Sequence, residues 1–514
     1  MKKMMKILMA ICLMLTVSVL FTACGSDTKS SEKSDPNRIL YERALSDVPT
    51  YDPFASNDVT TQRTHYQIFD TLIIQNKDGK YEPSACSKFE MNKAGDEITF
   101  TIREGMKFHN GQKVTPEDVV FSLNTAIKSK YTSKVTSTMK EAYLKDGKVV
   151  LKLKYPFKPI IGCLASCNLA IVPKNVYEKD PKSFAQKPIG SGPYMLDGVK
   201  KGETITLKAF KDYWRGEAKI KTVVQKVIKD NTAALMALES GGLDLMQPSQ
   251  DYSDRKALKE NKNVTYYEAP QAVFFDIGFN CEKGRFANKK LRMAVAMAVD
   301  KNDLIAGAIN GMGKPVDAAI VPLCPQYPKD FKGTEYNLEA AKKLLTEAGY
   351  PDGLTVTMRV IAATNYTKPA EVLQAQLKKI GINMEIETME RAAWFEKVYN
   401  GGDYEITYYA HPIPVADADF CTYSFFHSSE ADGNGNNFYN YKNPAMDALL
   451  EQARASQDEG QRADLYKKIA EMVRDEAICV PTYAGYRTMA AVNDLKGVYA
   501  DSFLRYYKYD YSWK

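Results

Sequence analysis

The sequence predicts a large α/β protein that folds into two lobes. Patterns typical of strands and of helices alternate along the whole chain, and no repeat of about 20 to 50 residues is visible. About 490 residues remain after an N-terminal export segment is removed, whereas one hydrophobic core rarely organises more than ~300. With 45% apolar and 26% charged residues the composition is ordinary for a globular protein, so at least two cores are expected.

Two strands and four helices are predicted from local patterns. Apolar side chains occupy every second position over 98–102 and over 382–386, as in half-buried strands. Helix starts are marked by side chains that can accept hydrogen bonds from the first turn, and helix ends by glycine. The expected helices begin after Thr115, Asp300 and Asn337 and at Pro369, and the last three end near Gly311, Gly349 and Gly381.

The N-terminus has the pattern of a bacterial export signal. Three lysines, an almost wholly apolar stretch over 7–20 and small residues precede Cys24. The apolar run is shorter than the ~20 residues that span a bilayer, and the serine-rich stretch after it offers little to a core. We expect a signal peptide over 1–23, a flexible tether over 24–37 and a mature protein that works outside the cytoplasmic membrane, where catalysis dependent on ATP or nicotinamide is not expected.

The segment around Cys24 resembles the lipobox of bacterial lipoproteins. The resemblance implies cleavage before Cys24 and diacylation of its thiol, although Phe21 stands where the family more often has leucine. An ordinary signal peptide that contains a cysteine is the alternative.

Charge and cysteine content exclude several classes of function. The net charge of +6 falls to +3 when the three lysines of the signal leave, and no basic block remains, so nucleic acid is not an expected partner. Seven cysteines remain in the mature chain, an odd number that leaves at least one thiol free, and Cys163 and Cys167 could pair in an oxidising compartment. There is no C-x-x-C pair and the four histidines stand apart, so neither a zinc site nor another cofactor is expected.

Four blocks in the right order resemble family 5 of the bacterial extracellular solute-binding proteins, the peptide, nickel and opine group that feeds ABC importers. The blocks are 100–121, then 190–194 with 212–216 and 237–244, then 279–280 with 291–300 and 340–350, and finally 443–450. They cover nearly the whole mature chain, and most of their residues are expected to build the fold rather than the binding site. Gly190-Ser191-Gly192 is neither a phosphate loop nor a nucleophile elbow, because Pro193 removes an amide and the G-x-S-x-G spacing is absent.

The resemblance implies a two-lobed periplasmic-binding-protein fold of type II, in the large class with an extra subdomain. Two crossing segments form the hinge, and the ligand is enclosed when the lobes close. The expected boundaries are 38–58, 187–269 and 487–514 for lobe I, 59–186 for the extra subdomain, and 270–486 for lobe II.

The resemblance also points to a ligand-binding loop after the strand over 404–409, which ends in Tyr408 and Tyr409. Peptide-binding members carry there an aspartate that binds the ligand's ammonium group, but Ile413 occupies that position here. Two readings stay open: Asp417, with Asp419 beside it, takes the role, or the ligand is not an ordinary free-amine peptide. Tyr408, Tyr409 and Phe420 are expected to stack on the ligand.

Lys368 and His411 are further candidates for ligand contact. Lys368 aligns with an arginine of dipeptide-binding relatives and could hold a carboxylate, or it is simply a solvated residue at a helix start. His411 raises the possibility of a metal chelate, since some relatives bind one through a histidine in this loop, but a hydrogen-bonded loop histidine is favoured. No metal is expected as a resident cofactor.

The leading hypothesis is a lipid-anchored receptor that captures short peptides and delivers them to an ABC permease and ATPase. A nickel-chelate or other small-solute receptor of the same fold is the alternative, and a signalling receptor is also open. An exported hydrolase is disfavoured, because no nucleophile and base occur in a recognisable motif. A monomer is expected, tethered by Cys24 at the cell surface or in the periplasm.

Overall fold

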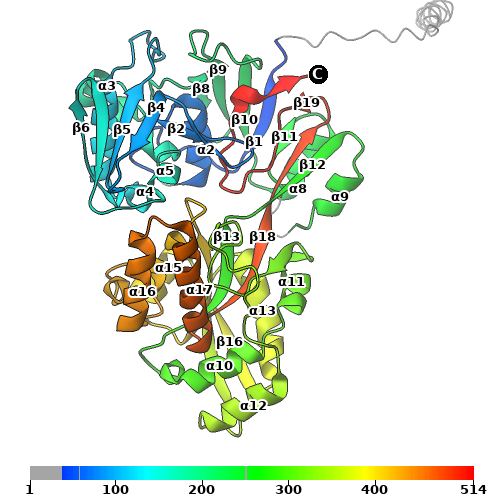
Figure 1. The fold of residues 1–514 in the computed structure, drawn as a ribbon. Coiled ribbons are helices and arrows are strands. Elements are labelled where there is room, and N and C mark those ends of the chain that lie inside the picture. The colour runs from blue at the N-terminus through cyan, green and yellow to red at the C-terminus, as the bar shows by residue number, and fades with distance from the viewer. Residues whose placement is uncertain (1–36, 57, 249–251) are drawn as a thin grey trace, which may run out of the picture. The chain divides into compact units, whose positions relative to one another are not determined.

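In the computed structural model, which describes residues 37–56, 58–248 and 252–514, twelve strands join into one hydrogen-bonded sheet (Figure 1). Residues 37–514 form one compact unit. The predicted signal peptide, the lipidation site at Cys24 and the predicted tether up to residue 36 lie outside the described residues. The sheet runs in the order β16 (Ile382–Met389), β15 (Leu354–Ile361), β17 (Ile406–Pro412), β13 (Val273–Phe279), β18 (Cys479–Val492), β11 (Leu245–Met246), β1 (Leu40–Ala44), β10 (Thr222–Val227), β9 (Thr204–Ala209) and β8 (Tyr194–Lys200), with β12 (Val264–Pro270) and β14 (Gly313–Pro315) also paired to β18.

Strand β18 connects two separate hydrophobic cores. Its first half pairs with β13, and its second half pairs with β12 and β11. Figure 1 shows it as one long arrow that passes from one group of strands into the other. We call residues 37–270 and 486–514 the first lobe and residues 271–485 the second lobe, so the chain crosses between them twice. The finer boundaries predicted from the sequence, and the extra subdomain over 59–186, stay a prediction.

The first lobe adds three small sheets and short helices to its share of the long sheet. Its principal core gathers buried side chains from both ends of the chain, from Leu40 to Tyr511. The small sheets are β4 (Cys86–Met91), β5 (Glu97–Ile102), β7 (Lys148–Leu153) and β6 (Met139–Lys145) in that order, β2 (Ile73–Gln75) with β3 (Tyr81–Pro83), and β19 (Leu495–Lys496) with β20 (Ser512–Trp513). The helices are α2 (Val59–Ile68), α3 (Pro116–Lys128), α4 (Ser133–Thr136), α5 (Ile160–Cys163), η1 (Cys167–Leu169), α6 (Lys174–Lys179), α7 (Pro181–Phe184), α8 (Asn231–Glu239), α9 (Arg255–Glu260) and η5 (Lys508–Asp510).

The second lobe packs longer helices against a mixed sheet. Strand β15 is parallel to both β16 and β17, as helical crossovers require, while β13 is antiparallel to its two neighbours. The helices are η2 (Arg285–Ala287), α10 (Lys289–Met297), α11 (Lys301–Ile309), α12 (Leu338–Glu347), α13 (Thr364–Lys378), α14 (Arg391–Trp394), the π-helical η3 (Phe395–Asn400), α15 (Asp419–Phe426), η4 (Ser428–Glu430), α16 (Pro444–Ala455) and α17 (Glu459–Asp475).

Most of the local predictions are confirmed. The strands predicted over 98–102 and 382–386 are β5 and β16. Thr115 closes a capping box with Asp118 at the start of α3, and Asp300 and Asn337 cap α11 and α12 through their side chains. These short polar side chains accept hydrogen bonds from first-turn amides that the helix itself leaves unpaired.

The predicted start of the helix at Pro369 is wrong. Helix α13 begins at Thr364, so Pro369 lies inside it and forfeits one backbone hydrogen bond. The apolar side chains of Tyr366, Ala370 and Leu373 are buried in the second core, and their burial favours the longer helix.

All seven cysteines of the described chain are free thiols, including Cys163 and Cys167. Within the same residues no helix is both long and apolar enough to cross a membrane. Nor do three or more histidine, cysteine or acidic side chains come together there as metal ligands would.

Gly190 and Gly192 allow the chain to approach the end of α2 closely. The amide of Gly192 donates to the carbonyl of Ile68 at 2.9 Å. A Cβ built on Gly190 would lie 1.9 Å from that same carbonyl oxygen. The motif around Ser191 therefore has a packing role, consistent with the exclusion of a phosphate loop.

Gly190→Ala is expected to lower the free energy of unfolding by about 1–3 kcal/mol, because the backbone at Ile68 must move to admit the methyl group. Gly198→Ala is the matched control, since a Cβ there meets nothing within 4 Å and should change stability by less than ~0.5 kcal/mol. Urea denaturation measures both variants, and equal losses would contradict the packing role.

Candidate ligand-binding site

A pocket of about 900 Å³ is lined by side chains from both lobes. That volume is near the upper end of the ~300–1,000 Å³ usual for small-molecule sites. The first lobe contributes residues from α4 and from the segment after β7. The second lobe contributes residues from the end of β17, from α15 and from the C-terminal part of α16. The lining residues used below are Lys134, Lys154, Tyr155, Phe157, Tyr409, Asp419, Phe420, Tyr423, Glu430, Glu451 and Arg454.

Aromatic rings form much of the wall. Phe157 of the first lobe meets Phe420 of the second edge to face, with ring centroids 5.9 Å apart. Tyr409, in the middle of β17, stacks on Trp394 with ring centroids 4.7 Å apart, which fixes its ring at the pocket. Such rings offer apolar faces for a ligand's side chains without demanding one particular side chain.

Asp419 and Arg454 form a bidentate ion pair in the wall. The two guanidinium nitrogens Nε and Nη2 donate to the two carboxylate oxygens, each at 2.8 Å. The guanidinium also lies over the ring of Tyr423, 3.1 Å from its centroid, and Nη1 donates to the hydroxyl of Tyr155 across the lobes at 3.4 Å. Burial works against the charge of Arg454, yet the bonded carboxylate of Asp419 raises the pKa of the guanidinium above its usual value.

A second buried pair lies behind the first. Arg462, on α17, is 1% exposed and donates to both oxygens of Asp417 at 2.7 and 2.8 Å. The side chain of Gln326 adds a bond to Asp417 at 3.3 Å and accepts one from the amide of Ala418 at 3.2 Å. Burial raises the pKa of Asp417, and Arg462 opposes that shift. This network holds the start of α15, and with it Asp419, in place.

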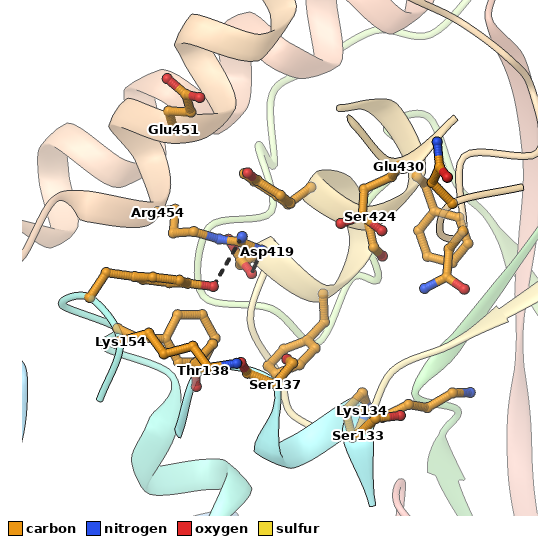
Figure 2. Close-up of a pocket in the computed structure, with 18 of the residues that line it drawn as sticks. Ser133, Lys134, Ser137, Thr138, Lys154, Asp419, Ser424, Glu430, Glu451 and Arg454 are labelled. Atoms are coloured by element: carbon orange, nitrogen blue, oxygen red, sulfur yellow. Dashed lines mark hydrogen bonds and ion pairs between the residues drawn. The ribbon is translucent and has the colours of Figure 1, made fainter. Parts of the chain in front are cut away.

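The remaining charges face the pocket from opposite sides. Figure 2 shows Lys134 on α4 and Lys154 beneath the pocket, with Glu430 and Glu451 on elements of the second lobe above it. Lys154 donates to the carbonyl of Ser137 at 2.8 Å, a bond that leaves its positive charge uncompensated.

Two of these groups have shifted pKa values. Burial raises the pKa of Glu430. Burial, and then the charge of Arg391 nearby, lower the pKa of Lys134. Both groups are partly desolvated, so a ligand charge of the opposite sign beside either of them would interact more favourably than it would in open water.

The loop between β17 and α15 also contacts the first lobe. Val415 is 3% exposed and packs in the first core against Gly162, where a Cβ would lie 2.3 Å from a Val415 methyl carbon. Arg505 donates to the carbonyl of Pro414 at 2.6 Å. Nearby, Lys158 and Glu459 join the lobes by a 2.7 Å ion pair.

The structure separates the site residues predicted from the sequence into two groups. Tyr409, Asp419 and Phe420 line the pocket. Tyr408 points to the opposite face of β17, is 0% exposed and bonds Thr482 at 3.0 Å. Asp417 is engaged by Arg462, as described above.

His411 and Lys368 do not line this pocket. His411 is 0% exposed, and its Nε2 lies 3.0 Å from Asp276 and 3.1 Å from the hydroxyl of Tyr439. Its ring stacks on Phe274 at 4.7 Å. Lys368 lies in the second turn of α13, half-buried. The assignment of these residues to the ligand stays a prediction.

Sequence reasoning missed Arg454, Arg462, Tyr155 and Lys134. Arg454 lies 35 residues from its partner Asp419, and Tyr155 lies 299 residues from Arg454. The pattern of α16 places Arg454 on a helix but contains no sign of the carboxylate that it meets. Only the fold brings these side chains together.

Comparisons with known proteins agree on one family. Residues 80–433 match the model described as bacterial extracellular solute-binding proteins, family 5, middle region. The chain is 27% identical over 532 residues to the oligopeptide-binding protein AppA of Bacillus subtilis (strain 168), covering 97% of this chain and 96% of that protein.

Solved structures give the same result. The periplasmic binding protein DppA from Helicobacter pylori, in complex with the peptide STSA, matches with a TM-score of 0.79 at 25% identity, covering 93% of this chain and 98% of that one. AgaA from A. tumefaciens R10, in complex with agropinic acid, matches with a TM-score of 0.78 at 25% identity, covering 93% and 99%. The two-lobed type II fold predicted from the sequence is confirmed.

Proposed function

Because the chain belongs to family 5 of the bacterial extracellular solute-binding proteins, we propose that it captures short peptides outside the cytoplasmic membrane. It hands them to an ABC permease and its ATPase. The resemblance found in the sequence is confirmed, and the chain is a solute-binding protein of the kind that feeds ABC importers. The peptide ligand, the lipid anchor and a monomeric state are parts of the proposal.

The arrangement of charge across the pocket carries the peptide proposal. A free peptide has an ammonium group at one end and a carboxylate at the other, and each needs a counter-charge when the lobes enclose it. Lys134 and Lys154 offer positive charge from the first lobe, and Glu430 and Glu451 offer negative charge from the second. The aromatic rings between them suit varied side chains. Named relatives that bind peptides support the same choice.

Identification of co-purifying ligand tests the proposal directly. Protein exported by its own signal is purified, denatured mildly, and the released small molecules are analysed by mass spectrometry. A set of short peptides is the expected result. A sugar–amino-acid conjugate or nickel with a chelator would overturn the peptide assignment while leaving the solute-binding class intact.

Removal of Lys134 is expected to affect one end of the ligand only. Lys134→Gln should weaken binding of the most abundant recovered peptide by about tenfold, since a hydrogen bond to a charged group is lost. The C-terminal amide of that peptide should bind wild type and variant alike. Lys130→Gln, in the same segment but outside the pocket, is the control. Titration calorimetry at one salt concentration measures the affinity of each protein for the free peptide and for its C-terminal amide. Equal losses of affinity for the two forms in Lys134→Gln would refute the carboxylate assignment.

The anchor at Cys24 is tested by fractionation. Cys24→Ser removes the thiol that would carry lipid, so the variant is expected in the soluble extracytoplasmic fraction, whereas wild type sediments with membranes. The same distribution for both proteins would favour an ordinary signal peptide.

A further inference from the structure

Two thiols of the second lobe touch beneath the pocket wall. The Sγ atoms of Cys324 and Cys421 lie 4.0 Å apart, in van der Waals contact. The side chains are 3% and 0% exposed, so they lie in the core. Neither thiol takes part in the site described above.

Both thiols sit in segments that position the pocket wall. Cys421 belongs to α15, the helix that offers Asp419, Phe420 and Tyr423 to the pocket. Cys324 ends a tight turn in which its amide donates to the carbonyl of Val321 at 2.9 Å. The amide of Val321 in turn lies 3.4 Å from the Sγ of Cys421, so the turn already rests on the helix.

The compartment favours oxidation of such a pair. Members of this family work outside the cytoplasmic membrane, where disulfides form and persist, whereas cytosolic thiols are kept reduced. A rotation of the two side chains has to bring the Sγ atoms from 4.0 Å to the ~2.05 Å of a disulfide.

We propose that Cys324 and Cys421 form a disulfide in the exported protein and that this bond fastens α15 to the turn over 321–324. The oxidant is a disulfide, carried either by an exported oxidoreductase or by a small molecule such as oxidised glutathione. One cysteine thiolate attacks that disulfide and releases one thiol. The second thiolate then displaces the other sulfur, so two protein thiols become one disulfide and the oxidant becomes two thiols.

Burial determines when the bond forms. Burial, and then the neighbouring thiol of Cys421, raise the pKa of Cys324 well above its usual value, so little thiolate exists in the folded protein. An external oxidant also cannot reach two side chains that are almost wholly covered. The exchange therefore takes place during folding, before α15 with Cys421 packs against the turn that carries Cys324.

The test begins with the wild-type protein recovered after export. It is denatured without reductant, alkylated, digested and analysed by mass spectrometry. A cross-linked peptide that joins Cys324 to Cys421 is expected, with alkylated Cys86, Cys163, Cys167, Cys281 and Cys479. The melting temperature should fall by roughly 5 °C or more with reductant, because the bond closes a loop of 97 residues in the unfolded chain.

Two variants make the assignment specific. The double variant Cys324→Ser with Cys421→Ser should melt at the same temperature with and without reductant. Cys163→Ser should keep the reductant sensitivity of the wild type. Alkylation of both Cys324 and Cys421 in the exported protein, or a cross-link between other cysteines instead, would overturn the proposal.

Discussion

Arg462→Ala is expected to lower the free energy of unfolding by about 3–5 kcal/mol, among the largest losses for a single substitution in this protein. Arg462 is 1% exposed and supplies both hydrogen bonds that compensate the carboxylate of Asp417. Its removal leaves that carboxylate buried with only the amide of Gln326 and its own local bonds. A buried charge without its partner costs more than the pair contributes when it is intact.

The pH dependence of the variant follows from the same group. Without Arg462 the folded-state pKa of Asp417 must rise further, because the opposing charge is gone while burial remains. A raised folded-state pKa gives stability that is present at low pH and lost as the pH rises through it. The loss in Arg462→Ala should therefore be smaller at acidic pH than at pH 8.

Chemical denaturation of matched variants measures both effects. Arg474→Ala on the same helix is the control, since Arg474 pairs with the exposed Asp475 and should contribute less than ~1 kcal/mol. The double variant Arg462→Ala with Asp417→Asn should recover part of the loss. If Arg462→Ala and Arg474→Ala lose the same stability, the pair is not the support that its geometry indicates.

Asp417→Asn also tests the ammonium assignment made from the sequence. For wild type and variant alike, the rise in melting temperature on adding ligand is measured from the melting temperature of the same protein without ligand. The lower stability of the variant itself is thereby removed from the comparison. If stabilisation by a free-amine peptide is unchanged, Asp417 does not bind the ammonium group.

Asp70 is expected to make stability fall as the pH rises from about 4 to about 7. The carboxyl is 5% exposed and accepts bonds from the Tyr213 hydroxyl at 3.0 Å and the Trp214 indole at 3.2 Å. Burial raises its pKa to about 7 against these donors. Within that range the folded state binds the proton more tightly than the unfolded chain does, so stability is lost as the proton leaves, by ~4 kcal/mol in all.

The comparison of Asp70→Asn with wild type isolates this contribution. The asparagine side chain is neutral at every pH, so the difference in unfolding free energy between wild type and variant should change by about 3 kcal/mol between pH 4.5 and pH 7.5. Asp212→Asn is the control, since that carboxylate is largely exposed and pairs with Lys107. Parallel pH profiles for wild type and Asp70→Asn would show that the carboxyl ionises normally.

Local patterns predicted elements well because their causes are local. The Thr115 cap and the alternation in β5 need only neighbouring residues, and both appear as expected. Helix α13 begins five residues earlier than predicted because burial of Tyr366 outweighs the bond that Pro369 cannot make. Residue type alone also could not tell which of Asp417 and Asp419 faces the pocket, since each has an arginine partner far along the chain.

The path of β18 has a consequence for synthesis and export. This strand pairs with β13 and β14 in the second lobe and with β11 and β12 in the first. Tyr511, beyond it, is 0% exposed in the first core. Neither lobe can finish its core until residues 479–511 are present, although both lobes begin hundreds of residues earlier. Such late, long-range pairing slows folding. The chain is therefore expected to stay unfolded while it is being translated, which is the state that a secretion channel accepts.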